Sequence, residues 1–260
     1  MAEHDDVRRL AREARLAISR EAERGRGDLW AIAAGEKVSP RPKRAAAPAA
    51  GATTTIEAPE MPPLLSPPGD TLEAIAAEVR GCTKCGLHET RTQAVPGVGR
   101  GATGIVFVGE APGAEEDRRG EPFVGRSGDL LTKIIAAMDE KQLIPGVTVS
   151  REAAFIGNVL KCRPPDNRNP MPHEIETCSP YLRRQLAVLQ PRVIVCLGKF
   201  AAELLVGAKG TIGGMRGTVY RYGDSKLIVT YHPAACLRNP AFKRPVWEDM
   251  QLLAREYVSP

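Results

Sequence analysis

The sequence predicts an α/β protein in which a parallel sheet is sandwiched between helices. From Thr71 onward, short apolar runs alternate with stretches of helical periodicity. The apolar runs are continuous rather than alternating, which is typical of strands that are buried on both faces. Strands that are separated by helices favour a parallel sheet covered by those helices.

The elements can be assigned in order along the chain. The stretch TLEAIAAEVR is a short amphipathic helix that leads into the first cysteine pair. Strands are expected at four β-branched or aromatic runs that end at glycine or polar residues: 104–109, 153–159, 192–198 and 226–231. Helices are expected between and after them, at 129–141, about 172–189, 199–205 and about 244–257.

The first 70 residues differ in composition from the rest of the chain. Residues 1–38 combine dense mixed charge with a thin apolar stripe, which predicts a charged helical extension, either solvated or docked on an unidentified protein partner. Residues 39–70 hold eight of the 22 prolines, which is typical of a flexible linker. The folded domain is therefore expected over residues 71–260.

Composition restricts the class of protein further. Six cysteines in 260 residues are too few for a secreted disulfide scaffold, so a reducing, cytoplasmic location is expected. The apolar runs are far shorter than the roughly 20 residues that cross a bilayer, so no membrane partner is expected. Residues 1–70 carry equal numbers of acidic and basic side chains, so the net charge of +5 belongs to residues 71–260. That excess is compatible with nucleic-acid binding but is weak evidence for it.

Polar, glycine and proline residues follow each predicted strand. Parallel sheets of this kind bind ligands at the carboxyl ends of their strands. The residues at these positions are 110–113, Asn158 with 161–164, Gly198 with Lys199, and His232 with Pro233. We therefore expect the active site at this edge of the sheet.

Four cysteines form a candidate set of metal ligands: Cys82, Cys85, Cys162 and Cys178. The first two form a C-x2-C pair outside any apolar run, and the last two lie 16 residues apart. Thiolates at this spacing hold either tetrahedral zinc or a cubane iron–sulfur cluster, and the spacing does not decide between them. Free thiols and a thioredoxin-like redox pair are the alternatives, the latter disfavoured by its position outside a βαβ unit. Cys196 and Cys236 are interpreted as structural.

The densest motif is the glycine-rich stretch 109–131, which follows the first strand. Its glycines let the backbone approach a ligand closely, although their spacing matches neither GxxxxGK[ST] nor GxGxxG. Phe123 stands in this polar loop and is placed either to stack on a flat ring or to plug the core. Glu110 directly follows the strand, where burial can perturb its pKa. The acidic run 115–117 is expected to be a solvated helix N-terminus.

Two further candidates stand at strand ends. His232 is the one histidine that follows a predicted strand, and it would converge with Glu110 and Asn158. The amide of Asn158 offers one acceptor and two donors, which is enough to read the edge of a nucleic-acid base. The structural alternatives are a hydrogen-bonding histidine and a turn asparagine.

Four segments in a fixed order carry a resemblance to a known family. They are GEAPGAEEDRRGEPFVGRSG, NVLKCRPPDNRNP with Cys178 following, CLGKFA, and YHPAACLRNP. Over about residues 73–258 the chain resembles the family 4 uracil-DNA glycosylases, the iron–sulfur branch of that superfamily. The resemblance implies a three-layer α/β/α sandwich with a four-stranded parallel sheet. It also implies hydrolysis of the N-glycosidic bond of deoxyuridine in DNA, the first step of base excision repair.

The resemblance implies roles for the candidate residues. Catalysis is assigned to His232, which would donate to the developing uracil anion, and to Glu110 or Glu116, which would orient water or stabilise the sugar cation. The loop around Glu116 would also exclude thymine. Substrate binding is assigned to five residues: Gly109, Ala111, Gly113, Phe123 and Asn158. Ala111 stands where other branches of the superfamily carry aspartate, so the identity of the general base is open.

The resemblance also implies a cofactor and a partner. The cysteine set Cys82, Cys85, Cys162 and Cys178 would hold a [4Fe-4S] cluster, with zinc the less favoured ligand. The partner is uracil-containing DNA, single- or double-stranded, bound by a monomer. Residues 234–239 resemble a duplex-invading loop, with Leu237 as its wedge and Arg238 near phosphate, or else form a turn with a buried leucine. Further phosphate contacts would come from basic side chains: Arg163, Arg168, Lys199, Lys243 and Arg244.

Two other classes of function remain open from the sequence. One is a non-catalytic iron–sulfur module on the same fold that binds DNA or senses redox state. The other is a zinc-stabilised hydrolase of other nucleotides. Release of uracil from DNA and the absorption of the purified protein near 400 nm discriminate among the three.

Overall fold

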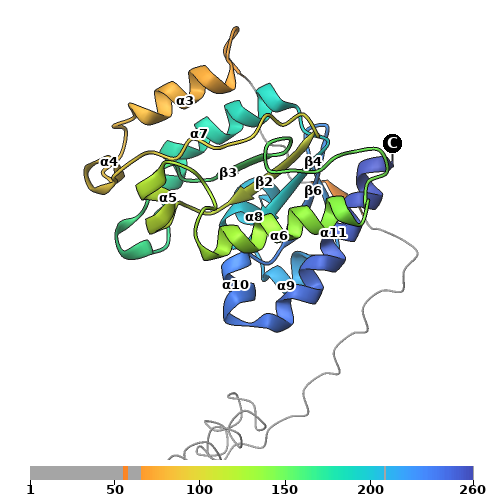
Figure 1. Cartoon of the computed structure of the whole chain (residues 1–260). Helices are drawn as coiled ribbons and strands as arrows, with labels where there is room; N and C mark the ends of the chain where they lie inside the picture. The colour runs from red at the N-terminus through yellow and green to blue at the C-terminus, as the bar shows by residue number, and fades with distance from the viewer. Residues whose placement is uncertain (1–54, 58–65, 208, 260) are drawn as a thin grey trace, which may run out of the picture. The chain divides into compact units, whose positions relative to one another are not determined.

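A computed structural model describes residues 55–57, 66–207 and 209–259. Its centre is a sheet in which four strands are mutually parallel: β2 (Ile105–Gly109), β3 (Phe155–Asn158), β4 (Val193–Leu197) and β6 (Ser225–Thr230). These are the four strands predicted from the sequence, and nearly all of their residues are buried (Figure 1). The predicted parallel sheet is therefore confirmed.

Two further strands extend this sheet, which has the order β1-β5-β6-β4-β2-β3. Strand β5 (Val219–Tyr222) runs antiparallel to β6, and β1 (Thr55–Glu57) runs parallel to β5. The sheet is thus mixed and larger than the expected four strands. Neither strand was predicted, because β5 is interrupted by the exposed Arg221 instead of being continuously apolar, and β1 is a three-residue strand defined by its pairing with an edge.

The boundary between linker and domain also differs from the prediction. Strand β1 lies inside the segment 39–70 that was expected to be linker. Asp70, at the end of that segment, accepts a hydrogen bond of 2.7 Å from Nε of Arg184 on helix α7. The domain therefore includes residues before 71. The predicted helical extension, residues 1–38, lies outside the described residues.

Helices cover both faces of the sheet. Their bounds are α3 Leu72–Arg80, α4 Leu87–Thr90, α5 Ala114–Arg119, α6 Arg126–Glu140, α7 Pro172–Leu189, α8 Lys199–Val206, α9 Ile212–Met215, α10 Pro233–Arg238 and α11 Lys243–Val258, with 3-10 turns η1 Pro165–Asn167 and η2 Pro240–Phe242. Helices α3, α7 and α8 contribute to the apolar core on one face, and α6 and α11 to the core on the other. This arrangement confirms the three-layer sandwich.

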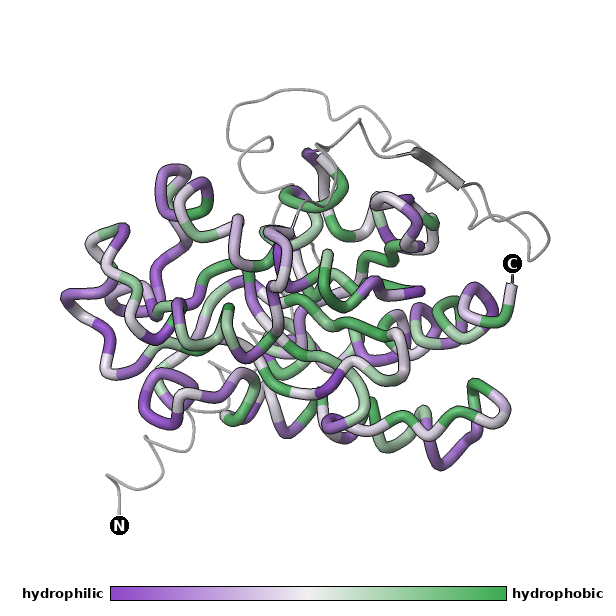
Figure 2. Tube along the Cα trace, turned by 90° about the horizontal axis from the view of Figure 1, so that it is seen from above, coloured by the Kyte–Doolittle hydropathy of each residue, from purple (hydrophilic) through white to green (hydrophobic). Residues whose placement is uncertain are grey.

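The apolar residues concentrate in the central strands, as Figure 2 shows, while polar residues dominate the surrounding loops. Burial of both sheet faces supplies the main driving force for this arrangement. The loops after β2, β3, β4 and β6 all open at one edge of the sheet. Gly198, after β4, has φ +97°, and a Cβ there would lie 3.1 Å from the Cβ of His232. Glycine at this position lets the end of β4 approach the end of β6.

No helix in the described ranges is both long enough and apolar enough to cross a membrane.

Candidate active site

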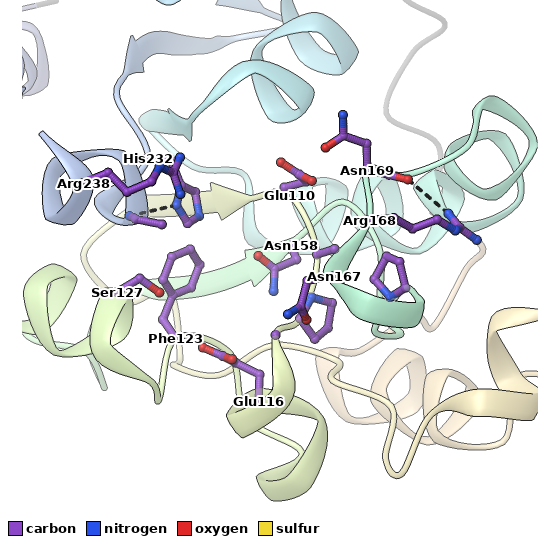
Figure 3. Close-up of a pocket in the computed structure, with 15 residues that line it drawn as sticks. Glu110, Glu116, Phe123, Ser127, Asn158, Asn167, Arg168, Asn169, His232 and Arg238 are labelled. Carbon is purple, nitrogen blue, oxygen red and sulfur yellow. Dashed lines mark hydrogen bonds between the residues drawn. The ribbon is translucent and has the colours of Figure 1, made fainter.

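A cavity of about 360 Å³ opens at the carboxyl edge of the sheet (Figure 3). It is formed by the residues that follow β2, β3 and β6, together with the first turns of α5, α6 and α10. Most of the candidate site residues line it: Glu110, Ala111, Gly113, Glu116, Phe123, Asn158, His232 and Arg238. Gly109 lies directly beneath, at the end of β2. A cavity therefore lies at the edge of the sheet where the sequence predicts the site.

His232 is the N-cap residue of helix α10, and its geometry fixes the position of its proton. The backbone N–H of Ala234 donates a hydrogen bond of 3.1 Å to Nδ1. Because Nδ1 acts as an acceptor, the neutral ring carries its proton on Nε2. Burial, with the positive charge of Arg238 as the second cause, lowers the pKa of His232 to about 4. The ring is thus a neutral donor at neutral pH.

Asn158 ends strand β3 in the floor of the cavity and is only 2% exposed. Within the described part of the chain its side-chain amide has no hydrogen-bond partner, so its donors and acceptor remain available to a ligand. Gly109 lies against it on the neighbouring strand. A Cβ at Gly109 would overlap the amide oxygen of Asn158 and would lie 2.6 Å from Cζ of Phe123. A glycine is therefore required at this point of the floor.

The loop that carries Phe123 is anchored from three directions. Phe123 itself has φ +54°, an unfavourable backbone conformation for a bulky residue that persists only when its surroundings enforce it. Oε1 of Glu116 accepts hydrogen bonds from the N–H groups of Val124 and Gly125, at 3.2 and 3.3 Å. Nη2 of Arg151 donates to the carbonyl oxygen of Pro122 at 3.0 Å. Gly128 packs directly on the backbone of Phe123, where a Cβ would overlap it.

The position of the Phe123 ring is compatible with both roles that the sequence left open. The ring is 5% exposed and packs in the apolar core formed with α6 and α11. It also lines the cavity, with its centroid 5.5 Å from that of the His232 ring. The ring is therefore held rigidly by core packing while one part of it borders the space that a ligand would fill.

The acidic run 115–117 is only partly the solvated helix start that was predicted. Glu115 is exposed, but Glu116 and Asp117 are 7% and 4% exposed. The carboxylate of Asp117 accepts hydrogen bonds from the N–H groups of Thr92 and Gln93, at 2.9 and 3.4 Å. Backbone donors thus satisfy both buried carboxylates. The expectation of a wholly solvated run is wrong for these two residues.

Glu110 and Glu116 differ in their surroundings. The carboxylate of Glu116 is engaged by the backbone of the Phe123 loop, which favours a positioning role over catalysis. Glu110 is half-buried beside the cavity, and burial raises its pKa. No hydrogen bond is formed by its side chain within the described residues. Glu110 is therefore the carboxylate of the two that remains free to act on a ligand or a water molecule.

The four candidate cysteine ligands line one separate cavity. Cys82 and Cys85 reach it from the segment between α3 and α4, and Cys162 and Cys178 from the end of β3 and from α7. Two of the sulfur atoms accept hydrogen bonds: Cys162 from Nη1 of Arg91 at 3.0 Å, and Cys178 from the backbone N–H of Lys161 at 3.2 Å. All of the cysteines in the described residues are free thiols.

The donors are of the type that holds a thiolate-bound cluster, because four thiols from distant segments line one cavity. Hydrogen bonds to the sulfur atoms are a common feature of such sites. No group of three or more His, Cys, Asp or Glu side chains in the described ranges is arranged to hold a metal ion. The other two cysteines, Cys196 and Cys236, are buried elsewhere, in β4 and α10.

Of the predicted DNA-binding residues, Arg238 lines the cavity, whereas Leu237, Arg163 and Lys199 are not among its lining residues. The segment 234–239 is largely helical, because His232 caps α10, so the expectation of a loop is wrong there. Leu237 is 38% exposed on this helix, which excludes the alternative of a buried leucine. Nε of Arg163 donates to Oδ1 of Asn167 at 2.8 Å. The exposed Lys199 begins α8, with Nζ 3.6 Å from Oε1 of Glu203.

Several residues of the cavity and its support were not among the candidates. Ser127, Asn167 and Asn169 line the cavity. The two asparagines belong to the polar run after β3, so their position beyond a strand end was a usable signal. Asn167 has φ +53°, and the neighbouring Arg168 forms an ion pair with the buried Glu174, at 2.6 Å. Arg151 and Lys161 act through long-range contacts that no local pattern indicates.

Replacing Arg151 with methionine removes the hydrogen bond to the carbonyl oxygen of Pro122 and should let Phe123 shift. Because a small displacement of a group that contacts the substrate is costly, kcat/KM for the substrate of the cavity should fall by about 10-fold. Lysine at this position reaches the carbonyl oxygen of Pro122 with one donor and should restore part of the loss. Steady-state kinetics of R151M, R151K and the exposed control R255M test this expectation. Equal kinetics for R151M and R255M would contradict the anchoring role of Arg151.

Comparison with known proteins defines the class to which this fold and site belong. The model of the uracil DNA glycosylase superfamily matches residues 96–251, which include the cavity. A type-4 uracil-DNA glycosylase of Archaeoglobus fulgidus is 46% identical over 190 residues, 70% of this chain and 91% of the relative. The type-4 enzyme of Sulfurisphaera tokodaii is 43% identical, over 74% of this chain and 87% of its own length. The type-4 enzyme of Thermotoga maritima is 42% identical, over 70% of this chain and 92% of its own length. The chain belongs to the type-4 uracil-DNA glycosylase family.

Proposed function

We propose that this uracil-DNA glycosylase, a DNA-repair hydrolase of N-glycosyl bonds, binds a uracil flipped out of DNA in the cavity at the carboxyl edge of the sheet. The observation that carries the proposal is the convergence of Phe123, Asn158 and His232 on that one cavity. An aromatic face, an unpaired amide and a neutral imidazole donor are the groups needed to hold and activate a base. Flipping costs a few kcal/mol, which contacts in the cavity would repay.

Recognition of the base would rest on shape and on one amide. The ring of Phe123 would stack on the uracil, and the amide of Asn158 would pair with its polar edge. Gly109, Ala111 and Gly113 present little side-chain bulk, so the base can lie close to the backbone. A Cβ at Gly113 would lie 2.8 Å from Oε2 of Glu116, so this part of the wall is closely packed. We propose that this wall excludes the methyl group of thymine.

Bond cleavage leaves negative charge on the uracil and positive character on the sugar. The Nε2–H of His232 would donate to the uracil oxygen on which the charge develops. Because the ring is neutral and fixed by the Ala234 N–H, it requires no reorientation during the reaction. Glu110 would orient the attacking water or stabilise the sugar cation. The pKa of Glu110 is raised because burial removes part of the water around its carboxyl group. In such surroundings a charged carboxylate attracts the positive charge on the sugar more strongly than it would in water.

DNA would approach the cavity across α10. Leu237 would enter the space that the flipped nucleotide leaves, and Arg238 would contact a flanking phosphate. Arg163 and Lys199 would add contacts that do not depend on sequence, so binding should weaken as salt concentration rises. We further propose that the protein acts as a cytoplasmic monomer and that residues 1–38 bind a protein partner.

The cysteine cavity would hold a [4Fe-4S] cluster through Cys82, Cys85, Cys162 and Cys178. Bound there, the cluster would cross-link the α3–α4 segment to the β3–α7 segment and so brace the loop that follows Asn158. Its role is structural, and the residues of the uracil cavity carry the chemistry. The convergence of the four thiols supports this proposal.

The experiment is release of uracil from single- and double-stranded oligonucleotides, with cytosine at the same position as the control substrate. The N158A and N158D variants should lower kcat/KM by roughly 5- to 150-fold, because a buried polar edge of the base loses its partner. The aspartate variant keeps the shape and removes the amide donors. Failure of the wild-type protein to release uracil, or full activity in both variants, would overturn the assignment.

A further inference from the structure

A buried lysine stands beside the uracil-reading residue. Lys161 is 1% exposed and lies in the turn that joins β3 to the third cysteine of the set. Lysine is almost never fully buried unless its ammonium is paired, since desolvation of the charge is expensive. The side chain therefore requires a reason to be in this position.

The ammonium of Lys161 is bonded to two neutral oxygen atoms. Nζ donates to the backbone carbonyl oxygen of Asn158 at 3.0 Å and to Oε1 of Gln185 at 2.7 Å. Gln185 is itself fixed, because its Nε2 donates to the carbonyl oxygen of Pro96 at 2.9 Å. No carboxylate forms an ion pair with Lys161 among the described residues. The positive charge thus has good hydrogen-bond geometry and no counter-charge among the side chains bonded to it.

The backbone of Lys161 contacts the cysteine cavity. Its N–H donates to Sγ of Cys178, at 3.2 Å, and its carbonyl oxygen accepts from the N–H of Val95, at 2.7 Å. Lys161 is also one of the residues that line that cavity. One residue therefore joins the cysteine cavity to the carbonyl group of Asn158.

The hydrogen bonds of Lys161 and of its neighbours fix the position of the turn after β3. The N–H groups of Val159 and Leu160 donate to the carbonyl oxygens of Gly109 and Glu110, both at 3.0 Å. The Lys161 ammonium then closes the turn by bonding back to the carbonyl oxygen of Asn158. Because the Asn158 amide has no side-chain partner in the described part of the chain, its direction depends on this backbone and on packing against Gly109.

We propose that Lys161 is a positioning residue for uracil recognition, which fixes the backbone of Asn158 to the wall of the cysteine cavity. This inference rests on the proposed role of Asn158 and deepens it. With a metal group bound, the sulfur atoms of the four cysteines would supply the counter-charge that the side chains bonded to Lys161 lack. Occupation of the cysteine cavity and orientation of the uracil-reading amide are therefore coupled through one side chain.

The test is a double-mutant cycle on the metal-loaded protein, with kcat/KM for uracil release as the readout. Lys161→Met should lower kcat/KM by about 10- to 100-fold, because it misplaces Asn158. In the N158A background the same substitution should cost no more than about twofold, since its target is already absent. The exposed lysine variant K141M should match the wild-type protein, and the K141M/N158A double variant should match N158A.

The outcomes separate this inference from the proposed function. If N158A alone leaves kcat/KM unchanged, the proposed recognition of uracil fails. If N158A is impaired and K161M multiplies that impairment by its full factor, the positioning role fails and the proposed function stands. If K161M does not fold, Q185M is the alternative variant, because it removes one of the two acceptors of the Lys161 ammonium. Q185M should lower kcat/KM less than K161M, and its effect should likewise disappear in the N158A background. Additive effects of Q185M would then overturn the inference.

A second readout does not depend on activity. The metal content of K161M, and the rate at which a chelator removes the metal, report on the counter-charge directly. We expect the variant to bind the metal and to lose it faster than the wild-type protein and K141M. Equal rates of loss for all three proteins would refute the coupling to the cysteine cavity.

Discussion

Replacing His232 with alanine should lower kcat for uracil release by about 10²- to 10³-fold. The substitution removes a donor that is already oriented toward the cavity, and loss of one such donor typically has an effect of this size. The ring needs no rearrangement, because the Ala234 N–H holds Nδ1 and leaves Nε2–H to donate. Single-turnover kinetics with saturating enzyme measure the chemical step apart from product release.

His232 also caps helix α10, so a second variant must separate the two roles. Asparagine is a strong N-cap residue and would keep the bond to the Ala234 N–H, but it lacks the imidazole Nε2–H. We expect H232N to keep the stability of the wild-type protein and to lose activity as H232A does. The exposed H173A, at the start of α7, is the matched control and should be unaffected. Wild-type kcat in H232N would assign His232 a structural role only.

The pKa of His232 predicts a specific pH dependence. Burial lowers this pKa to about 4, below the value near 6.5 in an unfolded chain. The unfolded state therefore binds more protons between these values. The stability that the neutral ring contributes is complete above about pH 6.5 and is lost as pH falls toward 4. Thermal unfolding at pH 7 and pH 5 should show a larger loss for the wild-type protein than for H232N, and an equal loss would contradict the lowered pKa.

The parallel core of the sheet could be predicted because burial leaves a local signature. Strands β2 and β4 are continuous runs of apolar residues, and such runs have few alternatives to a position between two helical layers. Strand β5 alternates around Arg221 and is short, and β1 depends on an edge that forms only when the chain is folded. Both strands are defined by pairing with strands that are distant or formed only on folding, and the local sequence carries little sign of this pairing.

The residues of the candidate site likewise fall into those that local sequence predicts and those that depend on tertiary contacts. Glu110, Asn158 and His232 were predictable because strand order places the residues after each strand at one edge. The buried state of Asp117 was not predictable, because the N–H groups that satisfy it belong to a segment 24 and 25 residues away. Lys161 is likewise explained by Gln185, which is 24 residues further along the chain. Local pattern locates the groups that face the ligand, and tertiary contacts determine the groups that hold them.

The second large effect is expected at the cysteine cavity, where Cys162→Ala should affect stability more than chemistry. The binding free energy of a structural metal group is part of the folding free energy, because the unfolded chain has no preformed site. Loss of one thiolate should therefore remove several kcal/mol. At about 2–4 °C per kcal/mol for a domain of this size, the unfolding midpoint should fall by about 10 °C or more.

The control for C162A is Cys196→Ala, which removes a buried thiol from β4 outside the cysteine cavity. C196A should keep its metal and lose only the packing of one small side chain. C162A should lose metal, lose absorption near 400 nm if that metal is a [4Fe-4S] cluster, and unfold at a lower temperature. Assayed well below that temperature, it should still release uracil, with a kcat/KM no lower than that of K161M, because Phe123, Asn158 and His232 all remain and only the positioning of Asn158 is weakened. A C162A protein that unfolds with C196A but is far less active than K161M would place the cysteine cavity in the chemistry and contradict its structural role.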